Sequence, residues 1–221
     1  MHVQTYVLIS YLIFGVINTN SGNLKNEEKT SRQMYQKMTK INFNKEVTYD
    51  QNAEKTDPFS AYVNISEFLP LNTGGWEFEF VIKYTGDESV EVYNPLYYLQ
   101  FTIVKQGVQL NTTFKAPIPL INIKSEISAD DFNFTISTIT ANGKEQIIKE
   151  EVNKACLVFN SGDERYYKLC IPGYEDSGKI ISFGAGSYQL VFLFSIISII
   201  KENVDPQYIT FKTSPITIQI E

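Results

Sequence analysis

"WEFEFVIKY", residues 76–84, alternates large apolar side chains with charged ones. A period of two is typical of a β-strand with one buried and one exposed face, because successive side chains of a strand point to opposite sides of the sheet. The apolar face of the predicted strand carries Trp76, Phe78, Phe80, Ile82 and Tyr84, and the opposite face carries Glu77, Glu79 and Lys83. This stretch therefore predicts an antiparallel sheet that covers a core on one side.

Similar short runs continue along the chain, broken by Gly, Pro, Asn and Asp. We count roughly twelve predicted strands and no long helix. Strands with one apolar face must bury it against a second sheet, so we predict an all-β, antiparallel two-sheet sandwich, with a jelly roll or a barrel as the alternative. The main further runs span residues 61–66, 88–94, 97–105, 108–114, 119–124, 132–140, 178–183, 188–196, 208–212 and 216–220.

"GAGSYQLVFLFS", residues 184–195, resembles the approach to a late strand in immunoglobulin-like sandwiches. In those domains a tyrosine at the corner bonds back to the backbone a few residues upstream. The resemblance covers only these few positions and implies that Tyr188 is the corner tyrosine. The apolar run at 188–200 is rich in β-branched and aromatic residues and too short for a helical membrane span, so it predicts a central buried strand.

The chain divides into three predicted parts. Residues 1–21 predict a signal peptide, because an apolar run from Tyr6 to Val16 has the length of a signal core. Residues 22–57 are polar and predict an N-terminal arm that is either a short helix or disordered. Residues 58–221 predict a single β-sandwich domain. These features favour a secreted, extracellular protein without a membrane span.

The two cysteines, Cys156 and Cys170, lie on strand-like runs that flank a turn-like "SGDE" at 161–164. A hairpin centred on Asp163 would place the two cysteines opposite each other, at a distance that a disulfide can bridge. In an oxidising compartment such a pair is interpreted first as a disulfide. We therefore predict a disulfide that closes this hairpin.

Three Asn-x-Ser/Thr sequons also agree with secretion: Asn64, Asn111 and Asn133. Each asparagine falls on the polar side of a two-residue alternation. We expect Val63 and Ile65 to face inward beside Asn64, Val108, Leu110 and Phe114 near Asn111, and Phe132, Phe134 and Ile136 near Asn133. A glycan on each asparagine would then face solvent.

The composition argues against most catalytic chemistry. The only histidine, His2, lies in the predicted signal peptide, so the predicted mature chain contains none. This argues against hydrolase triads that need histidine and against zinc sites built on imidazole. Asp176-Ser177-Gly178 matches an aspartic protease tripeptide, but a single copy is better interpreted as a turn between strands. The net charge of −6 disfavours binding to nucleic acid. We predict no enzyme activity, no cofactor and no metal.

A non-catalytic module that binds an extracellular protein or glycan is the function that remains. Outward tyrosines at Tyr93, Tyr98 and Tyr167, together with Asp163 and Arg165 of the hairpin loop, form the predicted binding surface. The alternatives are a secreted structural or assembly protein, a proteinase inhibitor that uses an exposed loop, and a carboxylate-based glycoside hydrolase. The oligomeric state differs among these alternatives.

Overall fold

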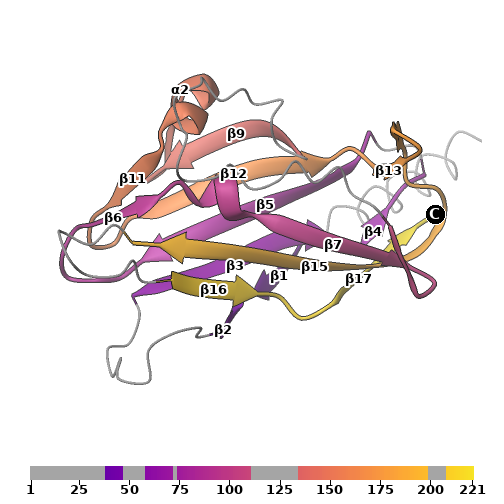
Figure 1. Ribbon diagram of the computed structural model, residues 1–221, viewed down its shortest axis with the longest axis horizontal. Coiled ribbons are helices and arrows are strands. Elements are labelled where there is room, and N and C mark those ends of the chain that lie inside the picture. The colour runs from indigo at the N-terminus through magenta and orange to yellow at the C-terminus, as the bar shows by residue number, and fades with distance from the viewer. Residues whose placement is uncertain (1–37, 47–57, 72–73, 111–133, 199–207) are drawn as a thin grey trace, which may run out of the picture. The chain divides into compact units, whose positions relative to one another are not determined.

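The computed structural model describes residues 38–46, 58–71, 74–110, 134–198 and 208–221, which form a β domain that begins at Met38 (Figure 1). The β5 sheet has the order β1 (Met38–Asn42), β3 (Phe59–Ser66), β5 (Trp76–Tyr84), β12 (Glu164–Ile171), β9 (Thr135–Ala141) and β10 (Lys144–Glu145). The β15 sheet contains β2 (Asn44–Glu46), β16 (Tyr208–Lys212), β15 (Gly186–Ile197), β17 (Ile216–Ile220) and β4 (Phe68–Leu69), with β7 (Gln100–Lys105) and β8 (Val108–Leu110) on its other side.

Two short ribbons and two short helices complete the described residues. The ribbons are β6 (Val90–Tyr93) with β11 (Cys156–Phe159), and β13 (Tyr174–Asp176) with β14 (Lys179–Ile181). The helices are the 3₁₀ helix η1 (Pro95–Tyr98) and α2 (Ile148–Asn153). The prediction of an all-β domain is confirmed, and the packed sheets are consistent with a β-sandwich.

Strand β5 has the predicted two faces. Trp76, Phe78, Phe80 and Ile82 are fully buried, and Glu77 on the other face is exposed. Val81 faces outward but is also buried, because its direct neighbours across the sheet are Tyr62 of β3 and Tyr166 of β12. The alternation that predicted the strand therefore also gives the orientation of its side chains.

Strand β15 is the central strand that the apolar run predicted. It pairs with β7 along one edge, and along the other edge its first half pairs with β17 and its second half with β16. Thr213 lies where the second edge changes partner: its N–H donates to Phe192 O at 3.0 Å and its Oγ1 accepts from Phe192 N at 3.0 Å. Among the described residues, no helix combines the length and the apolar character that a membrane crossing requires.

The core between the sheets is aromatic. Phe43, between β1 and β2, contacts Phe80 of the β5 sheet and Phe194 of the β15 sheet, with ring centroids 5.8 and 4.8 Å apart. Phe78 and Phe192 face each other across the sheets at 4.7 Å. Each such pair contributes about 0.5–1.5 kcal/mol beyond its buried area, so these contacts fix how the sheets pack.

Tyr188 makes the predicted corner contact. Its buried hydroxyl donates to Gly184 O at 2.8 Å, and its ring packs on Trp76 with centroids 5.3 Å apart. Lys105 Nζ lies 3.1 Å from the same hydroxyl. The backbone before β15 is therefore tied to the start of the strand.

Two sequence predictions about the strands need correction, and one short helix was missed. Strands β1 and β2 lie inside residues 22–57, so part of the predicted arm belongs to the β domain. Helix α2 was not predicted, because its six residues are too few to show a helical period. Val108 was expected to face inward but is 63% exposed, since it lies in a short outer strand beyond the turn at 106–107.

Candidate functional site

The predicted disulfide is absent, and both cysteines are free. Cys156 pairs with Tyr93 in the β6–β11 ribbon, whereas Cys170 pairs with Glu77 in the β5 sheet. The turn before Glu164 thus joins strands of two different sheets and does not close a hairpin. Both thiols are half-buried, and burial raises the pKa of each.

The two cysteine strands are parts of one long bent ribbon. Strand β12 pairs with β5 as far as Glu164 and Lys83, and β11 pairs with β6 from Phe159 and Val90. At the bend, Tyr84 N donates to Asp163 O at 2.9 Å and Gly162 N donates to Tyr84 O at 3.1 Å. The ribbon then reaches the far end of β15, where Val92 forms a bridge to Ser198.

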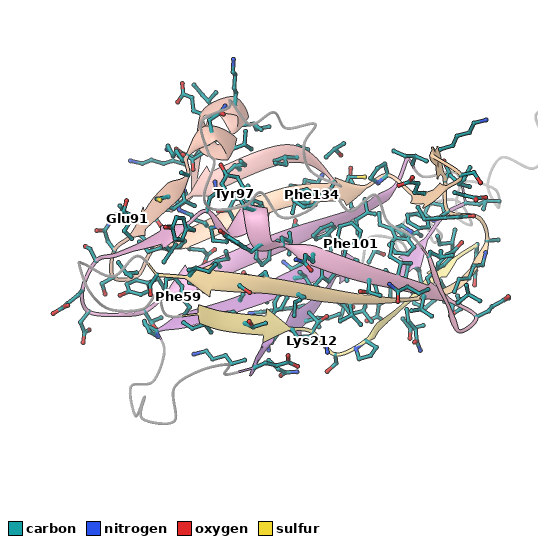
Figure 2. The ribbon with its side chains drawn as sticks, in the orientation of Figure 1. Phe59, Glu91, Tyr97, Phe101, Phe134 and Lys212 are labelled. Carbon is teal, nitrogen blue, oxygen red and sulfur yellow. The ribbon has the colours of Figure 1, made fainter. Side chains whose placement is uncertain are left out.

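The bend and its helices form one end of the β domain, which we call the loop end (residues 85–98 and 142–163). Figure 1 shows β6, β11 and α2 together there, whereas β13 and the C-terminus lie at the opposite end. Glu91 and Tyr97 mark the loop end in Figure 2. Because β15 has 12 residues, the two ends are separated by roughly 35–40 Å.

Buried side chains of η1 and its N-cap hold α2 in place. Asn94, 1% exposed, donates from Nδ2 to Glu151 O and Lys154 O, both at 3.0 Å. The Tyr97 hydroxyl donates to Val152 O at 2.5 Å. A helix of six residues is unstable alone, so these bonds to its last carbonyls supply the partners that it lacks.

An ion pair ties the same helix to β12. The Glu151 carboxylate is almost fully buried, and its Oε2 accepts from Arg165 Nη1 at 2.8 Å. Lys154 Nζ contacts the other carboxylate oxygen. A buried charge without a partner is costly. Removing either member of this pair therefore leaves the other uncompensated and destabilises the protein. The Arg165 guanidinium also lies over the Phe159 ring, 5.3 Å from its centroid.

The outer surface of the β6–β11 ribbon is apolar and aromatic as well as acidic. Val92, Leu157 and Phe159 are buried beneath it. On the outer side, the exposed Glu91 pairs with Val158, which is 50% exposed, and Tyr93 pairs with Cys156. Ile147, which precedes α2, is 63% exposed. The loop end thus presents exposed aliphatic side chains on a backbone fixed by buried bonds.

The predicted surface residues divide between this end and the core. Tyr93 lies on the outer side of the ribbon and is half-exposed. Tyr98, in η1, is half-buried and packs against the core. The outward prediction for Tyr167 is wrong: it is 1% exposed and stacks on Phe80 at 5.8 Å, so its neighbour Tyr166 faces outward instead.

Asp163 and Arg165 are structural in this fold. Burial alone would raise the pKa of Asp163, but bonds from Asn160 N at 2.8 Å and Asn142 Nδ2 at 2.7 Å lower it. The loop at 161–165 also bonds to Tyr84 through its backbone. It would have to break those bonds to enter a protease cleft in an extended form.

Of the three sequons, only Asn64 lies among the described residues; Asn111 and Asn133 lie outside them. Asn64 faces outward and is half-exposed, between the fully buried Val63 and Ile65, as predicted. The interpretation of Asp176-Ser177-Gly178 as a turn between strands is also confirmed, because Asp176 ends β13 and Ser177 and Gly178 form the turn to β14, with positive φ at both (52° and 78°).

The sequence analysis missed Asn94, Tyr97 and Glu151, which organise the loop end. The sequence analysis treated Asn and Pro only as breaks between strands, although the asparagine of the Asn-Pro step at 94–95 stands before a proline, which is a common position for a helix cap. In the described ranges, no three His, Cys, Asp or Glu side chains gather into a group able to hold a metal ion. Comparison with protein-family models, curated proteins and solved structures found no match.

Proposed function

We propose that this chain is a secreted, non-catalytic, immunoglobulin-like module that binds an extracellular protein through its loop end. The strand order supports the immunoglobulin-like assignment. β3–β5–β12–β9 matches the A-B-E-D order of such domains, and β17–β15–β7 matches G-F-C. The short β4 follows β3 in the chain but pairs in parallel with β17, so the chain passes there from the β5 sheet to the β15 sheet.

The tyrosine corner is the second support. Tyr188 stands near the start of the F-like strand, and its hydroxyl bonds to the backbone four residues upstream. Two departures accompany this match: the chain has no disulfide between sheets, and β1 with β2 precedes the A-like strand. The β6–β11 ribbon is a further addition, built from the connections that follow the B-like and D-like strands.

The observation that carries the binding proposal is the buried polar network beneath the loop end. Asn94, Tyr97 and the Glu151–Arg165 pair fix backbone that in a plain sandwich would be two short loops. Fixing a loop before binding lowers the entropy lost on association, which favours affinity. The loop end carries the exposed Val158 and Ile147 and the half-exposed Tyr93, which suit a protein partner because interface cores are rich in apolar and aromatic groups.

A capture experiment with matched variants tests the proposal. The protein is produced in a eukaryotic secretory host, immobilised, and exposed to the extracellular fluid in which it occurs, and bound proteins are identified by mass spectrometry. Val158→Arg alters the loop end, and Val108→Arg makes the same change at another exposed strand valine, near the opposite end. We expect one protein partner to bind the wild type and Val108→Arg but not Val158→Arg.

Several outcomes would contradict this proposal. Equal capture by all three proteins would place binding elsewhere. A partner that proves to be the same chain would favour the structural alternative, and retention only on a glycan array would replace protein by glycan recognition. Turnover of a polysaccharide or peptide by the purified protein would overturn its non-catalytic character.

A further inference from the structure

The outer face of the β5 sheet surrounds the Asn64 sequon with a defined set of neighbours. Across the sheet, Asn64 pairs with Lys40 of β1 and Glu79 of β5. Tyr62 precedes it by two residues on the same face, and Tyr166 lies one strand beyond Val81, the partner of Tyr62. Both tyrosines are half-exposed. Asn64 therefore lies on the outer face of β3, and the two tyrosines lie in the next row of residues across the sheet.

The hydrogen bonding of Asn64 is compatible with a covalent sugar. Its Nδ2 donates to Glu79 Oε2 at 2.8 Å. An N-linked sugar replaces one of the two amide hydrogens, so the other can still donate to this carboxylate. The Tyr166 hydroxyl lies against the same carboxylate; burial and then this contact raise the pKa of Tyr166. One carboxylate thus links the asparagine to the tyrosine.

The rest of this face is polar and its charges are matched. Lys168 pairs with Glu77 at 3.1 Å, Lys83 pairs with Glu164, and Lys40 Nζ lies 3.9 Å from the centre of the Tyr62 ring. A face of this kind offers a protein partner little apolar area to bury. A hydrated sugar, by contrast, can lay its C–H groups on a tyrosine ring and bond its hydroxyls to the surrounding charges.

We propose that Asn64 carries an N-linked glycan whose first sugars lie on the outer face of the β5 sheet, against Tyr166 and beside Tyr62. This inference rests on the secretion included in the proposed function. It makes one face of the sandwich a carbohydrate-covered surface and leaves the loop end for the partner. Ser66 completes the sequon, and its hydroxyl is buried and donates to Phe68 O at 2.6 Å.

The same geometry determines whether the glycan is attached before or after β3 pairs with its neighbours. Strand β3 is bonded on both edges, to β1 and β5, and the sequon hydroxyl is inside the fold. A transferase that needs an accessible sequon cannot act on this strand once it is paired. Attachment at Asn64 therefore precedes the pairing of β3.

The test uses the full chain in a eukaryotic secretory host, with Asn111→Gln and Asn133→Gln present so that Asn64 is the only sequon. We expect the secreted protein to carry one glycan, measured by intact mass before and after peptide N-glycosidase treatment, and Asn64→Gln to carry none. Retention of an unmodified chain inside the cell would overturn the proposed secretion and this inference together. Secretion with a bare Asn64 would overturn this inference alone.

The contact between the sugars and the Tyr166 ring is tested by the rate at which the same enzyme removes the glycan from the native protein. Tyr166→Leu removes the ring, and Tyr166→Phe keeps the ring but removes the hydroxyl. We expect the wild type and Tyr166→Phe to release the glycan roughly fivefold more slowly than Tyr166→Leu. Circular dichroism checks that the variants remain folded. Equal rates for all three would overturn the contact between sugar and ring.

Discussion

The Glu151–Arg165 pair gives the sharpest test of how the loop end is held. Both side chains are replaced by methionine, singly and together. Breaking a buried pair from one side costs about 3–5 kcal/mol. Arg165 keeps 13% exposure and Lys154 remains beside Glu151, so we expect each single replacement to cost about 3 kcal/mol. For a domain of this size this lowers Tm by roughly 6–12 °C.

The double variant separates the pair from ordinary packing. Removing both charges leaves neither uncompensated. We therefore expect the double variant to lose about 2–3 kcal/mol less free energy of unfolding than the two single variants lose in sum. Urea unfolding followed by the fluorescence of Trp76, the single and fully buried tryptophan, supplies the free energies. Lys168 and Glu77, an exposed pair at 3.1 Å that also involves β12, form the control cycle, with an expected coupling of about 0.5 kcal/mol. Additive losses at Glu151 and Arg165 would refute the reasoning.

Three further predictions concern a glycine, a buried tyrosine and the two cysteines. Gly75→Ala should destabilise the protein by about 2–4 kcal/mol in urea unfolding, because a Cβ there would lie 2.5 Å from Ile171 O and the φ of Gly75 is +141°. Gly74→Ala is the control and should be nearly neutral, because the space around its Cβ is open. Equal effects of the two substitutions would contradict this prediction. Burial, with a smaller contribution from Cys156, raises the folded pKa of Tyr97 to about 12, so its protonated form stabilises the fold fully below pH 10. The stability advantage of the wild type over Tyr97→Phe should therefore be constant from pH 7 to 10 and fall between pH 10 and 12; a pH-independent difference would argue against it. Alkylation of the unfolded protein without reductant should add two labels, since Cys156 and Cys170 are free, and an unlabelled chain would show a disulfide after all.

The parts of the fold predicted from sequence are those set by local alternation. β5 and β15 were both predicted because their side chains repeat every second residue, and that period decides which face is buried. The bond of Tyr188 to the backbone was also predictable, since its partner Gly184 is only four residues away. Local patterns contain this information because both groups belong to one short segment.

The errors share a physical cause, which is pairing between distant segments. The disulfide prediction assumed that Cys156 and Cys170 flank a hairpin, but each of their strands pairs with residues 76–93 instead. Nothing between Asn160 and Glu164 distinguishes a hairpin turn from a bend in a longer ribbon. Tyr167 was misplaced because adjacent tyrosines fit either phase of a strand, and contact with Phe80 decides between them.

The buried network was out of reach for the same reason. Asn94 and Glu151 are 57 residues apart in the chain, and Glu151 lies in a polar run that resembles a solvated surface. Only the folded ribbon brings η1 beneath α2. The candidate site therefore emerges from topology, while its individual residues look unremarkable.

The pairing of early strands with late ones has a consequence for how the chain folds. β2 pairs with β16 and β4 pairs with β17, so Glu46 meets Thr210 and Phe68 meets Gln219. Contacts so far apart in sequence close large loops before they gain any stability, which makes folding slow. While residues 208–220 are still being synthesised, both N-terminal segments lack these partners. The nascent chain therefore exposes unpaired strand edges until residues 208–220 have been made, and during that interval those edges are open to association with other chains.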